Sequence, residues 1–352
     1  MTVRTLVSTA ALTPLTLLAT RVATAQQRFT VGTASAARGQ TATGVISVPA
    51  GSDAGYDIPV AVVNGAKPGK VLALAAGSHG TEYASVIALE KLIGLLNPAE
   101  IAGTVIILPL INVNSFEHII PHLNPVDGKN MNRFFPGNLQ GTQTERASAV
   151  LTREVIEKSD HIIDMHGGDI DENLRPYSYW TVTGNAQQDS ISKEMVLAFG
   201  LDHIIISPDR PKDPAAARYL ENAGSTRGKP SFTVEAGRAG TVEPEDVQAL
   251  IDGTLGTMAY LKMLDRPVHP VEHPVWLENL ATVSSEVTGI FYPLVGRGTY
   301  VAQGMKLGYV TDYVGKIIAE PRATVAGVIT FVRAVPSLGK GDTIANIGVV
   351  AR

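Results

Sequence analysis

The sequence predicts an α/β fold, in which a mixed central sheet carries helices on both faces and a small all-β domain follows. Apolar runs at 71–76 and 105–110 are separated by a stretch, 82–96, in which apolar residues recur at helical spacing. Strands that are apolar throughout and alternate with helices indicate a sheet buried on both sides. From about residue 283 the helical pattern stops, and glycine and proline separate short apolar strands. This second pattern predicts a small β barrel or sandwich.

The individual elements follow this division along the chain. Short apolar stretches within 29–63 are separated by turn residues and predict strands. Residues 112–140 form a long irregular segment, and a loop of that length inside a compact domain is usually functional. Residues 265–274 contain three prolines and predict a linker. The remaining expected elements are helices near 144–158, 190–199 and 244–264, strands at 161–165, 203–206 and 231–234, and β-domain strands at 287–292, 300–302, 307–310, 316–319, 327–332 and 347–350.

The composition limits the class of protein. The chain has 352 residues, of which 45% are hydrophobic and 18% charged, which is typical of a folded protein with one large and one small domain. With a net charge of -4, the chain lacks the excess of positive charge that is typical of nucleic-acid-binding proteins. Because there is no cysteine, disulfides and cysteine-type zinc fingers are excluded. Any zinc ion must be bound by histidine, aspartate or glutamate.

The first 25 residues have the pattern of an export signal. Arg4 precedes an uncharged, mostly apolar run at 5–20, and Ala23-Thr24-Ala25 follows. This order of charge, apolar stretch and small residues predicts a secretory signal peptide at 1–25. A membrane anchor is the rival interpretation, but 16 residues separate Arg4 from Arg21, fewer than the roughly 20 that span a bilayer. We therefore expect a periplasmic or secreted protein with no membrane span after cleavage.

Three residues at strand ends predict a metal site. His79 and Glu82 lie three residues apart, where the apolar run 71–76 gives way to a helical pattern. His166 ends a second apolar strand and is followed by two glycines. In open α/β sheets the ligand crevice lies outside the carboxyl ends of the strands, so these three side chains are candidate zinc ligands. Asp164, on the same strand face as His166, either orients that imidazole or is an ordinary carboxylate at a sheet end.

Glu235 is the candidate for proton transfer. It ends the apolar strand 231–234, where burial of a carboxylate costs free energy. A carboxylate at such a position is therefore expected to serve a function. Placed over a zinc-bound water, it would act as general base and then as proton donor to a leaving amine. The alternative is a glutamate that caps the next turn.

The long loop contains a candidate carboxylate-binding pair. Arg133 offers a planar guanidinium that binds a carboxylate at two points, and Asn132 adds a further donor. The alternative for Arg133 is an ordinary solvated side chain on the surface.

These motifs, taken in order, resemble one known family. The series is His-Gly-Thr-Glu at 79–82, Asp-Gly-Lys-Asn-Met-Asn-Arg-Phe-Phe-Pro-Gly at 127–137, Asp-Met-His-Gly-Gly at 164–168 and Val-Glu-Ala-Gly at 234–237. It is similar to the succinylglutamate desuccinylase and aspartoacylase family, whose fold is zinc carboxypeptidase-like. The resemblance covers roughly residues 40–350.

The resemblance implies a role for each matched residue. His79, Glu82 and His166 would bind zinc, Glu235 would be catalytic, and the substrate carboxylate would be bound by Asn132 and Arg133.

One position departs from the pattern of this family. Its members usually have an arginine a few residues before the Pro-x-Asp-Gly turn, and this chain has His122 there. If the family arginine polarises the scissile carbonyl, either His122 replaces it with a weaker, pH-dependent charge or another residue serves. We include His122 among the expected substrate-binding residues.

The expected function is that of an exported hydrolase with one zinc ion per chain. It would cleave the amide bond of an N-acyl amino acid or a similar small carboxylate-bearing amide, with esters as further candidates. One alternative is a zinc carboxypeptidase that acts on short or cell-wall peptides. The other is a non-catalytic protein that binds zinc or a ligand on the same fold. The expected parts are a signal peptide, a zinc hydrolase domain and a C-terminal β domain, at 1–25, 26–282 and 283–352.

The C-terminal β domain has no obvious catalytic residue. It resembles barrel-like modules that carry biotin or lipoate, but the candidate turn at 311–315 lacks the lysine that such modules modify. We expect either a structural module or one that forms a homo-oligomer, and in both cases a module that also shapes the mouth of the site.

Overall fold

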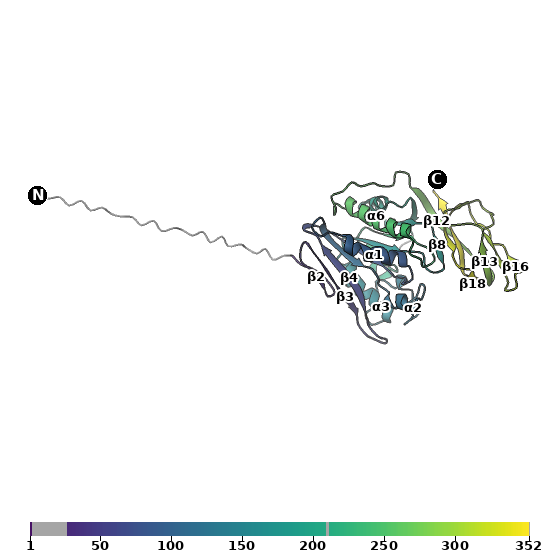
Figure 1. Cartoon of the computed structure of the whole chain (residues 1–352), viewed down its shortest axis with the longest axis horizontal. Helices are drawn as coiled ribbons and strands as arrows, with labels where there is room; N and C mark the ends of the chain where they lie inside the picture. Colours follow the sequence, from purple (N-terminus) through teal and green to yellow (C-terminus); the bar gives the residue numbers. More distant parts are fainter. Residues whose placement is uncertain (2–26, 209–210, 352) are drawn as a thin grey trace.

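The computed structural model describes Met1, residues 27–208 and residues 211–351. Apart from Met1, the signal peptide predicted at 1–25 lies outside the described residues. Figure 1 shows the arrangement of the chain and labels part of its helices and strands. No helix among the described residues has both the length and the apolar character that crossing a membrane requires.

Strands β3 and β4 form one edge of the large sheet, whereas β1 and β2 pair with each other in a separate sheet. β3 and β4 pair as an antiparallel hairpin, with Gln40 opposite Asn64 and Val48 opposite Tyr56. On its other side β4 pairs antiparallel with β6 (Ala102–Leu108). The inner strand β4 is more deeply buried than β3, as expected for its position between two neighbours. The first strands are β1 (Phe29–Val31), β2 (Ala34–Ala36), β3 (Gln40–Val48) and β4 (Tyr56–Asn64).

Parallel strands form the centre of the sheet. β5 pairs in parallel with β6 and β7, and β7 pairs in parallel with β11. β9 lies antiparallel to β11 and parallel to β10, so the sheet is mixed, as predicted. The central strands are β5 (Lys67–Ala76), β6 (Ala102–Leu108), β7 (His161–His166), β9 (Tyr177–Thr181), β10 (His203–Ser207) and β11 (Ser231–Glu235). Strand β9 was not predicted from the sequence.

Helices cover both faces of this sheet, which confirms the predicted layers. Alternate residues of β5 face opposite cores: Leu72 and Leu74 pack with α1, α4 and α6, whereas Ala73 and Ala75 pack with α3 and α5. This period of two follows from the pleat of a strand. The helices are α1 (Tyr83–Leu95), α2 (Val113–His118), α3 (Gln143–Leu151), α4 (Ala186–Phe199), α5 (Leu220–Ser225) and α6 (Pro244–Tyr260), with short helical turns at Met131–Arg133, Thr152–Ile156 and Pro214–Ala216.

The C-terminal strands form a small β sandwich, as predicted. β12 pairs in parallel with β10 and antiparallel with β19, so the large sheet continues into this region. A separate sheet of β16, β15, β13 and β18 packs against β17 and β19 around a shared apolar core. The strands are β12 (Val275–Ser284), β13 (Gly289–Pro293), β14 (Tyr300–Val301), β15 (Gly308–Thr311), β16 (Ile317–Ala319), β17 (Gly327–Arg333), β18 (Ser337–Leu338) and β19 (Thr343–Val350).

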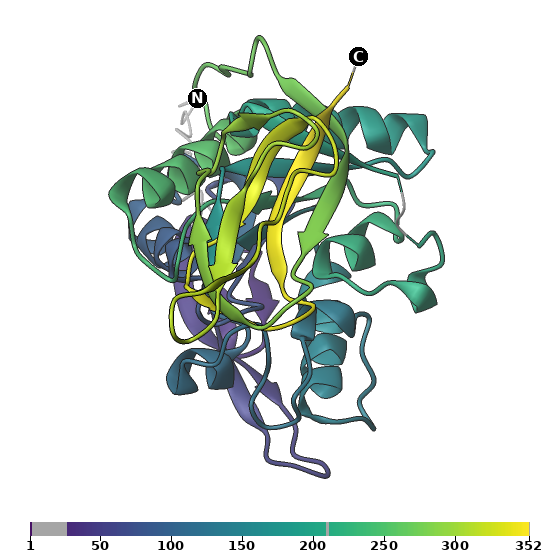
Figure 2. The same cartoon turned by 90° about the vertical axis from the view of Figure 1, so that its right-hand side faces the viewer.

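Figure 2 looks onto this sandwich, with its green and yellow strands in front. The domain boundary predicted between 282 and 283 falls within β12, and the division into domains stays a prediction. The short strand β8 (Glu172–Leu174) pairs with β17. The sandwich therefore contacts the segment that follows β7.

Candidate active site

A tight turn after β5 positions His79 and Glu82. Gly77 has a positive φ of 68°, which an L side chain rarely adopts. Gly80 packs so closely on α2 that a Cβ there would lie 2.2 Å from the backbone nitrogen of Phe116. The turn brings Nδ1 of His79 to 2.6 Å from Oε1 of Glu82, which directly precedes α1.

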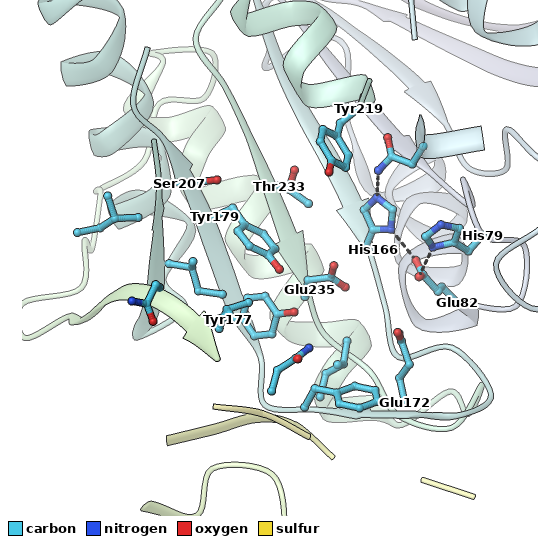
Figure 3. A pocket seen from close by; sticks show the side chains of 18 of the residues that line it. His79, Glu82, His166, Glu172, Tyr177, Tyr179, Ser207, Tyr219, Thr233 and Glu235 are labelled. Atoms are coloured by element: carbon cyan, nitrogen blue, oxygen red, sulfur yellow. Dashed lines mark hydrogen bonds and ion pairs between the residues drawn. The ribbon is translucent and has the colours of Figure 1, made fainter. Parts of the chain in front are cut away.

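His166 completes a metal-binding triad with these two residues. It is the last residue of β7, and its Nδ1 lies 2.9 Å from Oε2 of Glu82. One ligand atom of each residue lies within 4.8 Å of the others, and all three residues are buried. Figure 3 shows both imidazoles directed toward the Glu82 carboxylate. Two imidazoles and one carboxylate converging from separate elements form a three-residue donor set that suits a divalent metal ion and leaves a coordination position for water.

The triad carries strong mutual electrostatic interactions. Burial opposes ionisation of Glu82, but the charges of His166 and His79 and their hydrogen bonds outweigh it and hold the pKa of Glu82 well below its usual range. Burial likewise opposes the charged form of His166, but Glu82 and Asp164 raise the pKa of His166 well above its ordinary value. A metal ion must therefore displace a proton from His166, since a ligating imidazole is neutral.

Two groups behind His166 fix its orientation. Its Nε2 lies 2.9 Å from Nδ2 of Asn132 and 3.3 Å from Oδ1 of Asp164. Asn132 is itself held, because its Oδ1 accepts a hydrogen bond from the backbone of Leu220 at 2.8 Å. Of the two roles considered for Asp164, its place beside the imidazole favours orientation of a metal ligand. Asn132 is 5% exposed, and its predicted role in substrate binding stays a prediction.

Glu235 lies at the neighbouring strand end. The register of β11 places it beside His166 of β7 and Tyr177 of β9, and it faces the cavity between them in Figure 3. Burial, reinforced by the charge of Glu82, outweighs the attraction of His166 and raises the pKa of Glu235 well above its usual value. A carboxylate in such surroundings readily accepts and holds a proton.

Arg133 lines the same cavity. Its guanidinium lies 4.8 Å from the centre of the Tyr219 ring, and its Nη1 donates a hydrogen bond to the backbone oxygen of Asn132 at 2.6 Å. The stacking and the backbone contact restrict this side chain near the triad. Its predicted role as a carboxylate anchor stays a prediction.

His122 lies beside His79 and is held between carboxylates. Its Nε2 is 2.9 Å from Oδ1 of Asp171, and its Nδ1 is 3.2 Å from Oδ2 of Asp169. Burial lowers the pKa of His122, but the hydrogen bond to Asp171 and the charge of Asp169 outweigh burial and raise it to about 9. The imidazole is thus charged at neutral pH, and both ring nitrogens face carboxylates. Its predicted role in substrate binding stays a prediction.

The segment after β7 carries site residues that sequence reasoning missed. Asp169 and Asp171 each contact one ring nitrogen of His122. Burial and the charge of Glu82 raise the pKa of Glu172, in the same segment, to about 7. Arg333 of β17 lies 3.5 Å from Asp171 and links this segment to the sandwich. The run of acidic residues directly after His-Gly-Gly was the sequence feature that could have identified this segment as part of the site.

The metal triad and Glu235 line one cavity of about 550 Å³, together with Asn132, Arg133, His122 and Glu172. Tyr177 and Tyr179 of β9, which were also missed, form part of its wall. The C-terminal sandwich contributes Phe331 and Asn346, so it shapes the mouth of the site, as expected. The complete lining is His79, Glu82, His122, Asn130, Asn132, Arg133, His166, Glu172, Leu174, Tyr177, Tyr179, Ile205, Ile206, Ser207, Pro208, Tyr219, Thr233, Glu235, Glu278, Asn279, Leu280, Phe331 and Asn346.

Comparisons with known proteins agree with this geometry. Residues 68–261 match the model of the succinylglutamate desuccinylase/aspartoacylase catalytic domain. An N-alpha-acetyl-L-2,4-diaminobutyric acid deacetylase of Halomonas elongata is 31% identical over 299 residues, which cover 83% of this chain and 86% of that protein.

Solved structures show the same fold. A succinylglutamate desuccinylase/aspartoacylase from Rhodobacter sphaeroides superposes with a TM-score of 0.79 at 23% identity, over 89% of this chain and 96% of its own. The product-bound ectoine utilization protein EutE (DoeB) from Ruegeria pomeroyi has a TM-score of 0.80 at 23% identity, over 88% of this chain and 95% of its own.

Proposed function

The chain belongs to the succinylglutamate desuccinylase/aspartoacylase family and is a hydrolase of amide C–N bonds, and we propose that it is a monozinc deacylase of N-acyl amino acids. The observation that carries this proposal is the convergence of His79, Glu82 and His166 beside Glu235 at adjacent strand ends. The three ligands supply nitrogen and oxygen donors, which suit zinc.

In the proposed reaction some residues bind and orient the metal ion, and Glu235 transfers the proton. A bound zinc ion would lower the pKa of its water toward 7 and polarise the amide carbonyl. Glu235 takes the proton of the attacking water and later delivers it to the nitrogen of the leaving amine. Asp164 and Asn132 keep the His166 ring in its binding orientation through the contacts at 3.3 and 2.9 Å. His122, which lines the cavity beside His79, is the candidate for contacting the substrate carbonyl.

The direct test is an assay of the purified protein on a panel of amides. N-alpha-acetyl-L-2,4-diaminobutyrate is the first substrate to try, because the relative from Halomonas elongata carries that activity in its name. Release of acetate from this or another N-acetyl amino acid is the expected result. Preferential cleavage of short peptides with free C-termini would favour the carboxypeptidase alternative. Metal binding without hydrolysis of any amide or ester would favour the non-catalytic alternative.

Arg133→Gln should weaken binding of the substrate carboxylate. A charge-assisted hydrogen-bonded contact contributes about 1.5–3 kcal/mol, so we expect KM to rise about tenfold to a hundredfold with a smaller change in kcat. Steady-state kinetics on an N-acetyl amino acid and on its methyl ester measure this, because the ester lacks the carboxylate that Arg133 would bind. Arg322→Gln, an exposed arginine on the sandwich, is the matched control. Equal KM values for wild type and Arg133→Gln would remove Arg133 from the substrate site.

We also propose that the protein is exported and that the signal peptide is cleaved after Ala25. The support is the order of charge, apolar run and small residues at the N-terminus. Expression in a bacterial host should yield a mature chain that begins at Gln26 in the periplasm or medium. N-terminal sequencing after cell fractionation measures this, and an intact Met1 in the cytoplasmic fraction would contradict it.

We further propose that the sandwich mediates assembly with a second copy of the chain. The turn between β15 and β16 exposes Tyr313 and Val314, which are 78% and 89% accessible, and Ile317 and Ile318 extend this apolar surface. Exposed apolar patches commonly mark interaction sites. We expect Val314→Asp to lower the mass measured by light scattering from that of an oligomer to that of a monomer. Ser284→Asp, at an exposed position at the end of β12, is the control. A monomeric wild-type protein at high concentration would overturn the proposal.

A further inference from the structure

The cavity extends well beyond the triad across the face of the sheet. Strands β7, β11, β9, β10 and β12 are neighbours in this order. Their register aligns Asp164 with Thr233, Thr233 with Tyr179, and Tyr179 with Ile205. Side chains two residues apart share a face of a strand, so His166 and Glu235 lie on this face as well. Four strand spacings separate β7 from β12, which is about 19 Å.

An N-acetyl amino acid fills only part of this length. It corresponds to two residues of extended chain, or roughly 7 Å. The cavity of about 550 Å³ lies in the range of sites that hold larger ligands, about 300–1,000 Å³. The part over β9, β10 and β12 therefore has room for a group that an acetylated substrate does not provide.

The position of Arg133 sets the direction of the substrate. Arg133 follows Asn132, whose amide contacts His166, and its guanidinium stacks on Tyr219, so we place Arg133 at the triad end of the cavity. If it binds the carboxylate of the amino acid, the amino acid part lies at that end. The acyl part then points away from it, along β9 and β10.

The far part of the cavity has a different chemical character from the triad end. It is lined by Tyr179, Ile205, Ile206, Pro208 and Leu280, with Ser207 and Asn279 as neutral polar groups. Among the described residues that line this part, Glu278 is the charged one, whereas Arg133 and His122 lie near the triad. A carboxylate at the end of an acyl chain would therefore meet an acidic side chain here, and an uncharged chain would be accepted.

We propose that this part of the cavity is an acyl-chain subsite, and that the enzyme prefers amino acids with an uncharged, linear acyl group longer than acetyl. The subsite rests on the proposed deacylase function. Its floor is formed by Tyr179, Ile205 and Ser207, and the label of Ser207 in Figure 3 marks the end away from the triad.

The first test compares N-acetyl, N-hexanoyl and N-succinyl derivatives of one amino acid. Each methylene that fills a complementary pocket improves discrimination by roughly tenfold or more, so we expect kcat/KM for the hexanoyl compound to exceed that for the acetyl compound at least about tenfold. The succinyl compound should be cleaved more slowly than the hexanoyl one. Equal or faster cleavage of the acetyl or succinyl compound would overturn the subsite while leaving the deacylase function intact. Cleavage of none of the three would overturn both.

The second test blocks the subsite. Ser207 is partly exposed, so Ser207→Trp can fill the far part of the cavity without disturbing the core. We expect the ratio of kcat/KM for the hexanoyl compound to kcat/KM for the acetyl compound to fall at least about tenfold. Ser284→Trp, an exposed position on β12 outside the cavity, is the matched control. An equal loss on both substrates would contradict a separate subsite.

Inhibition of the wild-type protein tests the subsite without a variant. Hexanoate and acetate are the acyl products of the two substrates, and hexanoate should inhibit at a concentration at least about tenfold lower. Equal inhibition by the two acids would overturn the proposal even if Ser207→Trp does not fold.

Discussion

Glu235→Gln is expected to lower kcat by about a hundredfold to ten-thousandfold, the usual contribution of a positioned general base, while the metal stays bound. Glutamine has nearly the same shape as glutamate but cannot accept the proton of the attacking water. The register that sets Glu235 beside His166 does not depend on the charge of either side chain. The metal site should therefore persist, and the loss should appear in turnover alone.

The measurement combines kcat on an N-acetyl amino acid with the metal content of the same preparation. Glu90→Gln is the matched control, because Glu90 is exposed on α1 and away from the cavity. If Glu235→Gln keeps most of its turnover with metal bound, Glu235 is not the base. Loss of metal together with activity would instead assign Glu235 a role in building the site.

The metal triad could be predicted because its determinants are local. His79 and Glu82 lie within one turn, and the glycines that force this turn are adjacent in sequence. His166 ends a strand that is apolar throughout, and the carboxyl ends of parallel strands meet at one edge of the sheet. The ligands therefore converge whenever β5 and β7 are neighbours, whatever the details of the loops.

Strand β9 was missed because its formation depends on distant partners. The segment Tyr-Ser-Tyr-Trp-Thr at 177–181 has high strand propensity but follows a proline and lacks a clear apolar pattern. It becomes a strand by inserting between β10 and β11, parallel to β10 and antiparallel to β11. The wall formed by Tyr177 and Tyr179 could not be derived without that pairing.

The surroundings of His122 also depend on tertiary contacts. No local pattern places His122 against Asp169 and Asp171, which lie 47 and 49 residues away. These carboxylates convert an ordinary imidazole into a stable cation, since they raise its pKa to about 9. A histidine at this position therefore keeps its charge at neutral pH, which the sequence alone would not predict.

His166→Ala is expected to remove the metal from the purified protein and to abolish turnover with it. Deleting one of three protein ligands leaves two, and even loss of a group that merely orients a ligand weakens metal affinity 10–100-fold. We expect zinc to fall from about one per chain to near zero by elemental analysis, with a loss in zinc affinity of at least about a hundredfold. His269→Ala, an exposed histidine between α6 and β12, is the matched control and should keep its zinc.

The pH dependence of zinc binding gives the same test a second readout. In the metal-free protein, Glu82 and Asp164 raise the pKa of His166 well above its usual value despite burial. Below that pKa a proton occupies the imidazole, and zinc must displace it. Wild-type zinc affinity should therefore fall as pH decreases, by about tenfold per pH unit for one displaced proton. In His166→Ala the residual affinity should fall less steeply, because this proton is no longer displaced. Retained zinc in His166→Ala, with an unchanged pH dependence, would mean that the metal is bound elsewhere in the chain.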